Sequence, residues 1–242
     1  MPAPRPLPAP RAILFDLFHT LVSLPPLQAG EPAIADILGV PHEEWERCFY
    51  RDDVLGRALG HATDALDIMR VVTHGIDPSV GHDRIVAAVE TRRRRIEDAL
   101  LRPDPAFIEA LDLVRAAGIR TALVSDAGAD DVECWQASPL RERLDAVCFS
   151  FALGVRKPDP RIYQHAMAAV GAVPAETLFV GDGGSDELQG ARALGIGTVL
   201  VTRLVGMAWP HVLPDRRPHA DWEFEDVPAF VGALMAYGSD FR

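Results

Sequence analysis

The sequence has 242 residues, of which 48% are hydrophobic and 24% charged, and its formal net charge is −11. These values are ordinary for a soluble globular protein with one large domain, or one domain with a smaller insertion. The negative net charge argues against a nucleic-acid partner. No apolar run is long enough to span a membrane, and the N-terminal residues lack the apolar core of a signal peptide. Cys48, Cys134 and Cys148 show no disulfide or metal-site spacing. We therefore expect a cytoplasmic monomer or homodimer.

The chain begins with a proline-rich stretch and continues with short apolar runs separated by helical patterns. Residues 1–10 are predicted to form a disordered tail. Four apolar runs end at polar or glycine turns and a fifth is weaker; in chain order they cover residues 12–15, 119–124, 146–149, 177–180 and 198–201. Such runs are typical of buried parallel strands. With helices between them, they predict an α/β fold with a doubly wound, mainly parallel sheet.

Capping residues mark the helices that connect these strands. Residues 104–118 have helical apolar spacing and end in a glycine suited to a C-cap. A second helix is predicted to begin with Asp159 as N-cap and Pro160 at its first position, and to end at Gly171.

The segment 24–102 differs from the rest of the chain because it has helical spacing throughout and no strand-like run. It is predicted to be an all-helical insert between the first strand and the rest of the sheet. The expected domains are a helical cap at 23–103 and an α/β core made of 11–22 and 104–242. The arginine-rich run at 91–95 is interpreted as a solvated helix face.

Acidic residues follow two of the predicted strands. In an open α/β sheet a ligand binds at the carboxyl ends of the strands, where this sequence places Asp16, Asp182 and Asp186. Carboxylates brought side by side repel one another, so a positive group must lie between them. Hard oxygen ligands in a cleft suit Mg²⁺.

Hydroxyl groups and one lysine are expected at the same edge of the sheet. Lys157 is the only lysine in the sequence, and it stands just before the helix predicted at 159–171. Thr20 and Ser125 follow the first and second strands. Each residue alone fits a turn or a helix cap, but together they are the groups needed to bind Mg²⁺ and a phosphoryl group.

Four stretches resemble the motifs of the haloacid dehalogenase-like hydrolase superfamily. They are FDLFHTL at 15–21, LVSDAG at 123–128, GVRKPDPRIY at 154–163 and the segment 179–201, which begins FVGDGGSDEL. The insert is placed like the cap of the subfamily that contains phosphoglycolate phosphatase, β-phosphoglucomutase and 2-haloacid dehalogenase. The resemblance covers nearly the whole chain after residue 10. It implies a Rossmann-like core with a cap that closes over the site, and a Mg²⁺-dependent hydrolase of a small phosphorylated metabolite.

The resemblance also implies a role for each site residue. Asp16 matches the nucleophile that forms an aspartyl-phosphate. Lys157 matches the lysine that bridges nucleophile and phosphate and neutralises charge. The other matching positions are Thr20, Ser125 and Asp126 for the phosphate, and Asp182, Asp186 and the backbone carbonyl of Phe18 for the metal that Asp16 also binds.

Phe18 departs from the phosphatase pattern, in which a second aspartate stands two residues after the nucleophile as general acid and base. Such help contributes roughly 10²–10⁴-fold, and a phenylalanine supplies none. His19, the next residue, is not expected to replace this general acid and base, because on an extended chain its side chain would point away from the site. Dehalogenases of this type resemble the chain in carrying an aromatic residue here and use no metal, but they lack the acids kept at Asp182 and Asp186. A phosphonate-cleaving enzyme would need a cap lysine, and the insert has none.

The favoured interpretation is a phosphohydrolase with weakened acid–base chemistry, acting on substrates with good leaving groups such as acyl or aryl phosphates. A metal-independent 2-haloacid dehalogenase and a catalytically weak or inactive binding protein stay open as alternatives. In the insert, Arg57 and His61 are candidate contacts for an anionic substrate.

Overall fold

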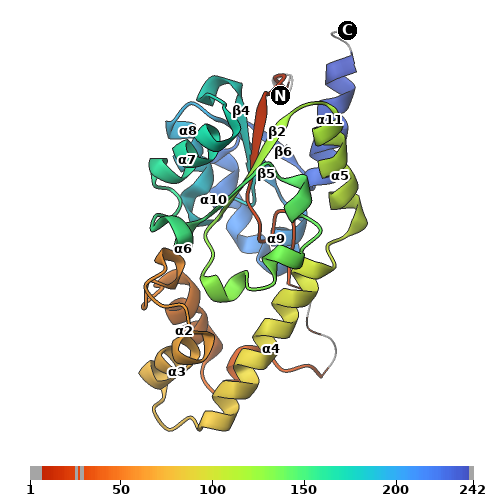
Figure 1. The fold of residues 1–242 in the computed structure, drawn as a ribbon. Coiled ribbons are helices and arrows are strands. Elements are labelled where there is room, and N and C mark those ends of the chain that lie inside the picture. The colour runs from red at the N-terminus through yellow and green to blue at the C-terminus, as the bar shows by residue number, and fades with distance from the viewer. Residues whose placement is uncertain (1–6, 25–26, 28–29, 240–242) are drawn as a thin grey trace.

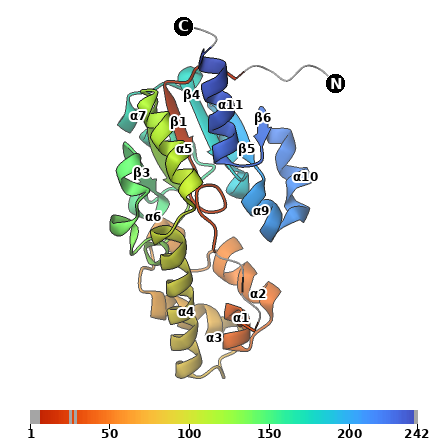
Figure 2. The same cartoon turned by 90° about the vertical axis from the view of Figure 1, so that its right-hand side faces the viewer.

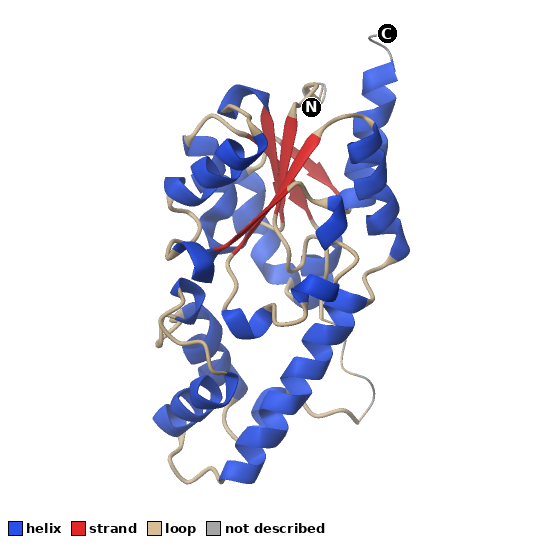
Figure 3. Ribbon diagram, in the orientation of Figure 1, coloured by secondary structure: helices blue, strands red, loops and turns tan. Residues whose placement is uncertain are grey.

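A single parallel sheet forms the centre of the molecule. The computed structural model describes residues 7–24, 27 and 30–239. In this part of the chain six strands pair in the order β3-β2-β1-β4-β5-β6 (Figures 1 and 3). Their bounds are β1 Ala12–Phe15, β2 Arg120–Ser125, β3 Ala146–Phe149, β4 Thr177–Gly181, β5 Gly197–Val201 and β6 Trp222–Phe224. The predicted α/β doubly wound sheet is confirmed.

Five of these strands coincide with the apolar runs of the sequence, whereas β6 was not predicted. It has three residues, and the middle one, Glu223, is exposed. Because β6 lies at the edge of the sheet, it needs no continuous apolar run to bury.

Helices cover both faces of the sheet. Alternate residues of β1 point to opposite sides, so Ile13 and Phe15 pack in one apolar cluster and Ala12 and Leu14 in another. The first cluster includes α5 (Pro105–Ala116) and α11 (Val227–Ser239), and the second includes α7 (Pro160–Val170) and α8 (Glu187–Ala193). These two layers lie on opposite sides in Figure 1. Shorter helices are α6 (Ser150–Leu153), α9 (Arg203–Ala208) and α10 (Leu213–Arg216).

The start of α7 shows how local sequence places a site residue. The side chain of Asp159 accepts a hydrogen bond from the Arg161 amide at 2.9 Å, Pro160 is the first helical residue, and Gly171 ends the helix at φ 64°. Each is where capping chemistry predicts it. The helix start holds the preceding loop, which carries Lys157, close to the sheet.

The chain between β1 and α5 forms a separate helical layer with its own core. Its helices are α1 (Ile34–Leu38), α2 (His42–Glu46), α3 (Ala65–Ile76) and α4 (His82–Leu101), and a short 3₁₀ helix spans Arg57–Leu59. Their apolar cluster is distinct from the two that flank the sheet. Figure 2 shows these helices at one end of the sheet, the end toward which the chain leaves β1. We call this layer the cap.

The N-terminal segment is only partly described. Residues 1–6 of the proline-rich tail lie outside the described residues, but Leu7 is buried against the main core. Within the stretch expected to be disordered, the apolar side chain of Leu7 packs beside the sheet. All three cysteines are free. None of the helices in the described ranges combines the length and apolar character of a membrane span.

Candidate active site

The site lies where two neighbouring strands in the middle of the sheet, β1 and β4, both end. Phe15 pairs with Val180 across them, and the Asp16 amide donates to the Val180 carbonyl at 2.9 Å. Asp16 therefore lies beside the turn that follows β4 and carries Asp182. This end of the sheet faces the cap, which is at the bottom of Figure 1.

Lys157 joins two carboxylates in the interior. Its Nζ lies 2.5 Å from Asp16 Oδ1 and 2.6 Å from Glu187 Oε2, and its side chain is 3% exposed. The Lys157 amide also donates to Oδ1 of Asp126 at 2.9 Å, which holds the loop in place. Charge-assisted hydrogen bonds of this kind fix both the ammonium and the Asp16 carboxylate in one orientation.

Of the two hydroxyl residues predicted for phosphate binding, Thr20 contacts Asp16 directly and Ser125 ends the strand next to β1. Thr20 Oγ1 donates to Asp16 Oδ2 at 2.9 Å, so each Asp16 oxygen has a partner. Ser125 is the buried last residue of β2, the strand on the other side of β1 from β4. Asp126 follows it, and its Oδ2 is buried without a hydrogen-bond partner in the described part of the chain.

The turn after β4 brings Glu187, rather than Asp186, to this group. Ser185 and Asp186 both have left-handed backbone conformations, with φ 53° and 51°. The turn leaves Asp186 exposed, where its Oδ1 accepts a hydrogen bond from Gln189 Nε2 at 3.0 Å. The structure thus brings Asp16, Thr20, Lys157 and Glu187 together and leaves Asp186 outside.

Glu187 is the site residue that the sequence analysis missed. Its Oε1 accepts a hydrogen bond from the Gly183 amide at 2.8 Å, and a Cβ on Gly181 would overlap that same oxygen. The absence of a side chain at Gly181 is therefore required for the buried position of Glu187. The available signal was an acid in the first turn of a helix, directly after a glycine-rich turn.

Three acids form a group that can hold a metal ion. Asp16, Asp182 and Glu187 are buried, and each offers one carboxylate oxygen, with the oxygens all within 4.8 Å of one another. Oxygen ligands at this spacing fit a hard divalent cation such as Mg²⁺.

Burial and mutual repulsion act on the charges of this group. Burial raises the pKa of Asp16, Lys157 opposes this effect and Asp182 adds to it. Burial also raises the pKa of Glu187 well above its ordinary range, although the charge of Lys157 acts to lower it. For Lys157 burial favours the neutral amine, but the surrounding carboxylates raise its pKa well above the ordinary value. The group is therefore short of positive charge, which a bound cation would supply.

Arg216, at the end of α10, holds the third carboxylate. Its Nη1 donates at 2.8 Å to Asp182 Oδ2 and at 2.8 Å to the Asp182 carbonyl. The other carboxylate oxygen, Oδ1, accepts from the Gly184 amide at 2.9 Å. Two cations, Lys157 and Arg216, thus face three carboxylates.

Phe18 and His19 lie on the turn that leaves Asp16. The Phe18 side chain packs against the main apolar core. His19 has φ 62°, so the chain here is not extended as its position had suggested. Its Nδ1 lies 3.0 Å from Ser23 Oγ and its ring contacts Trp209 with centroids 4.7 Å apart. Burial lowers the pKa of His19, which favours the neutral imidazole.

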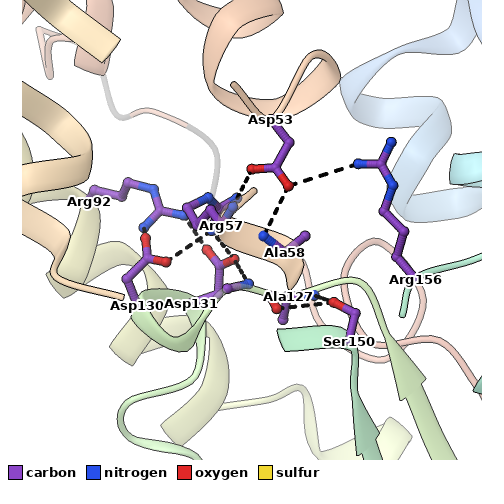
Figure 4. Close-up of polar contacts among 10 residues, drawn as sticks. Asp53, Arg57, Ala58, Arg92, Ala127, Asp130, Asp131, Ser150 and Arg156 are labelled. Carbon is purple, nitrogen blue, oxygen red and sulfur yellow. Dashed lines mark hydrogen bonds and ion pairs between the residues drawn. The ribbon is translucent and has the colours of Figure 1, made fainter. Parts of the chain in front are cut away.

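The cap contacts the core through a buried ion cluster, shown in Figure 4. Arg57 Nη1 lies 3.1 Å from Asp130 Oδ1 and also binds Asp131, while Arg92 Nη1 lies 2.8 Å from Asp130 Oδ2 and also binds Asp131. All four side chains are at most 8% exposed. The two aspartates belong to the loop that leaves β2 just after Ser125, so the cap is joined to a loop of the site.

This cluster changes the interpretation of two predicted features. Arg92, in the run taken for a solvated helix face, is buried because its charge is paired across the interface. Arg57, a candidate anion contact, is occupied by the chain's own carboxylates, and His61 is exposed. Beside them Asp53 accepts hydrogen bonds from the Arg57 and Ala58 amides at 2.8 and 3.0 Å (Figure 4).

Comparison with known proteins places these features in a family. The model of the haloacid dehalogenase-like hydrolases matches residues 10–195. Phosphoserine phosphatase of Thermus thermophilus is 32% identical over 134 residues, which are 52% of this chain and 53% of that protein, so the match spans about half the relative's length. Glyceraldehyde 3-phosphate phosphatase of Methanopyrus kandleri is 29% identical over 229 residues, 91% of each chain.

Dehalogenases are similar too. (S)-2-haloacid dehalogenase 1 of a Pseudomonas strain is 28% identical over 141 residues, 57% of this chain and 61% of that protein. The structure of L-2-haloacid dehalogenase from Xanthobacter autotrophicus superposes with a TM-score of 0.61 at 19% identity, covering 93% of this chain and 98% of that one. At this identity the superposition establishes a common fold.

Proposed function

The chain belongs to the haloacid dehalogenase-like hydrolase family, and we propose that within it the protein is a Mg²⁺-dependent phosphohydrolase of a small phosphorylated metabolite. The observation that carries the proposal is the trio of buried carboxylates, Asp16, Asp182 and Glu187, around one lysine. A dehalogenase reaction needs one nucleophilic carboxylate, and it gives no reason to bury two more beside it.

The charges of the site support an anionic substrate. The carboxylates of Asp16, Asp182 and Glu187 outnumber the two cations that bind them, Lys157 and Arg216. Mg²⁺ held by these three acids, with the Phe18 carbonyl as the predicted further ligand, would add positive charge and stabilise the charge of a phosphoryl group. Asp186 was predicted as a metal ligand, but its exposed side chain does not support that role.

The residues around Asp16 provide for attack on phosphorus. Lys157 and Thr20 hold the two Asp16 oxygens and keep the carboxylate oriented as a nucleophile that would form an aspartyl-phosphate. Lys157, Thr20, Ser125 and Asp126 are the proposed phosphate contacts. Phe18 has no ionisable group, so it gives no proton to a leaving group. The substrate should therefore carry a good leaving group, as acyl and aryl phosphates do.

A metal-independent 2-haloacid dehalogenase is the second candidate. It is supported by the dehalogenase relative and by Phe18, since a halide leaves without a proton.

A substrate panel with Mg²⁺ or with a chelator separates the candidates. Acetyl phosphate, an aryl phosphate, an alkyl phosphate and 2-chloropropionate are the four substrates. We expect Mg²⁺-dependent phosphate release from the first two. Chloride release in the chelator would establish the dehalogenase, and no turnover of any substrate would favour a binding protein.

A further inference from the structure

Arg216 binds Asp182, one of the three carboxylates that would hold the metal ion. Its guanidinium binds Asp182 through both the carboxylate and the backbone carbonyl, each at 2.8 Å. The Asp182 side chain is 9% exposed and that of Arg216 is 18% exposed, so water screens the contact poorly. Asp182 is the one carboxylate of the trio that Lys157 does not bind in the described structure.

The turn after β4 is shaped to receive this arginine. Gly183 has φ 84°, and a Cβ there would lie 3.0 Å from both Cβ and Cδ of Arg216. A side chain at Gly183 would therefore crowd the stem of Arg216 as well as strain the backbone. Two independent features, the paired hydrogen bonds and the space left by Gly183, fit Arg216 to Asp182.

We propose that Arg216 is an internal counter-ion of Asp182 that competes with the divalent cation, so that metal binding must displace or weaken the Arg216–Asp182 pair. This inference rests on the proposed Mg²⁺-dependent function and adds a regulator of its metal affinity. Without metal, Arg216 offsets the repulsion among the three carboxylates. With metal, a guanidinium beside the cation repels it.

Arg217 provides a matched control because it follows Arg216 in the chain and carries the same charge. It is half-exposed and pairs with Glu223 at 3.0 Å, away from Asp182. At physiological salt an exposed charge of this kind is largely screened.

The test is calorimetric titration of Mg²⁺ into the wild-type protein and three variants, Arg216→Gln, Arg216→Lys and Arg217→Gln. We expect the dissociation constant to fall on the order of tenfold in Arg216→Gln, and to stay within about threefold of wild type in Arg216→Lys and Arg217→Gln. Binding by Arg216→Gln alone would support the proposal in its strongest form.

Thermal unfolding supplies a second readout. In Arg216→Gln we expect a lower melting temperature without metal and a larger rise on adding Mg²⁺ than in wild type, because the cation replaces the lost counter-ion. A purely structural role would lower the melting temperature equally with and without Mg²⁺, and that result overturns the proposal.

The outcomes separate this inference from the proposed function. If the wild-type protein binds Mg²⁺ and Arg216→Gln binds it no more tightly, the competition is disproved while the metal-dependent function stands. If neither protein binds Mg²⁺, both are disproved, and Arg216 is then the permanent partner of Asp182.

Discussion

Lys157 Nζ and Asp16 Oδ1 lie 2.5 Å apart although 141 residues separate them in the chain. Asp16 directly follows the first strand and Lys157 stands before α7, so the fold of the whole core brings them together. The second oxygen of Asp16 is held by Thr20 at 2.9 Å. In the reaction that we propose, this oriented carboxylate is the nucleophile.

The first prediction concerns Phe18 and the leaving group. Phe18→Asp should raise turnover of an alkyl phosphate by about tenfold or more, because the new carboxyl can protonate the departing alkoxide. The gain should stay below the full general-acid effect, since the carboxyl enters an apolar setting. Turnover of acetyl phosphate should change little, because its leaving group needs no proton.

Phe18→Asn is the matched control for that experiment. It introduces a polar side chain of similar size to aspartate that cannot exchange a proton. Equal gains in both variants would show that the effect comes from altered packing.

The second prediction separates two adjacent acids. Glu187→Gln should weaken Mg²⁺ binding at least about tenfold, since Glu187 is one of the three buried carboxylates. Asp186→Asn removes the same charge one residue earlier, from an exposed side chain, and should leave the affinity within about twofold. Calorimetric titration of both variants measures the difference. A larger loss of Mg²⁺ affinity in Asp186→Asn than in Glu187→Gln would instead show that Asp186 is the metal ligand.

The third prediction concerns the buried ion cluster between cap and core. Arg92→Ala should lower the free energy of unfolding by about 3–5 kcal/mol, because it leaves Asp130 and Asp131 buried with one cation instead of two. Arg93→Ala, at the next position of α4, removes an exposed arginine 3.9 Å from Glu97 and should cost at most about 0.5 kcal/mol. Denaturant unfolding measures both. Similar losses in the two variants would mean that the cluster contributes no net stability.

The fourth prediction is acid sensitivity of the same cluster. Burial opposes ionisation of Asp131, but Arg92 and Arg57 lower its pKa from the ordinary 3.8 to about 2. A carboxyl with a lowered pKa contributes stability above its ordinary pKa and loses it as the pH falls toward the folded-state value. The stability difference between wild type and Asp131→Asn should thus shrink by about 2 kcal/mol between about pH 5 and about pH 2. A constant difference measured by denaturant unfolding would contradict the lowered pKa.

Local sequence predicts those features of the fold that depend on local chemistry. Five strands follow from short apolar runs, and the limits of α7 follow from Asp159, Pro160 and Gly171. The closeness of Asp16 to Asp182 follows from a general rule, because both come at the carboxyl ends of parallel strands.

The remaining features depend on contacts between distant segments, or on a turn whose backbone conformation cannot be predicted from its residue types. Glu187 reaches the site because Ser185 and Asp186 adopt left-handed conformations that non-glycine residues seldom show. Arg92 is buried because Asp130 and Asp131, 38 and 39 residues further along the chain, pair with it across the interface. Arg216 likewise meets Asp182 across 34 residues. No periodicity or motif marks either arginine.

The central claim is that Asp16 becomes phosphorylated during turnover, and trapping the intermediate tests it most directly. The protein is mixed with acetyl phosphate and Mg²⁺, quenched in acid within a turnover, digested and analysed by mass spectrometry, with Asp16→Asn as control. We expect a phosphoryl group on the peptide that contains Asp16, accumulating because Phe18 supplies no base to activate water, and none in the control. Phosphate release by the wild-type protein without any adduct on Asp16, or undiminished release by Asp16→Asn, would contradict the account.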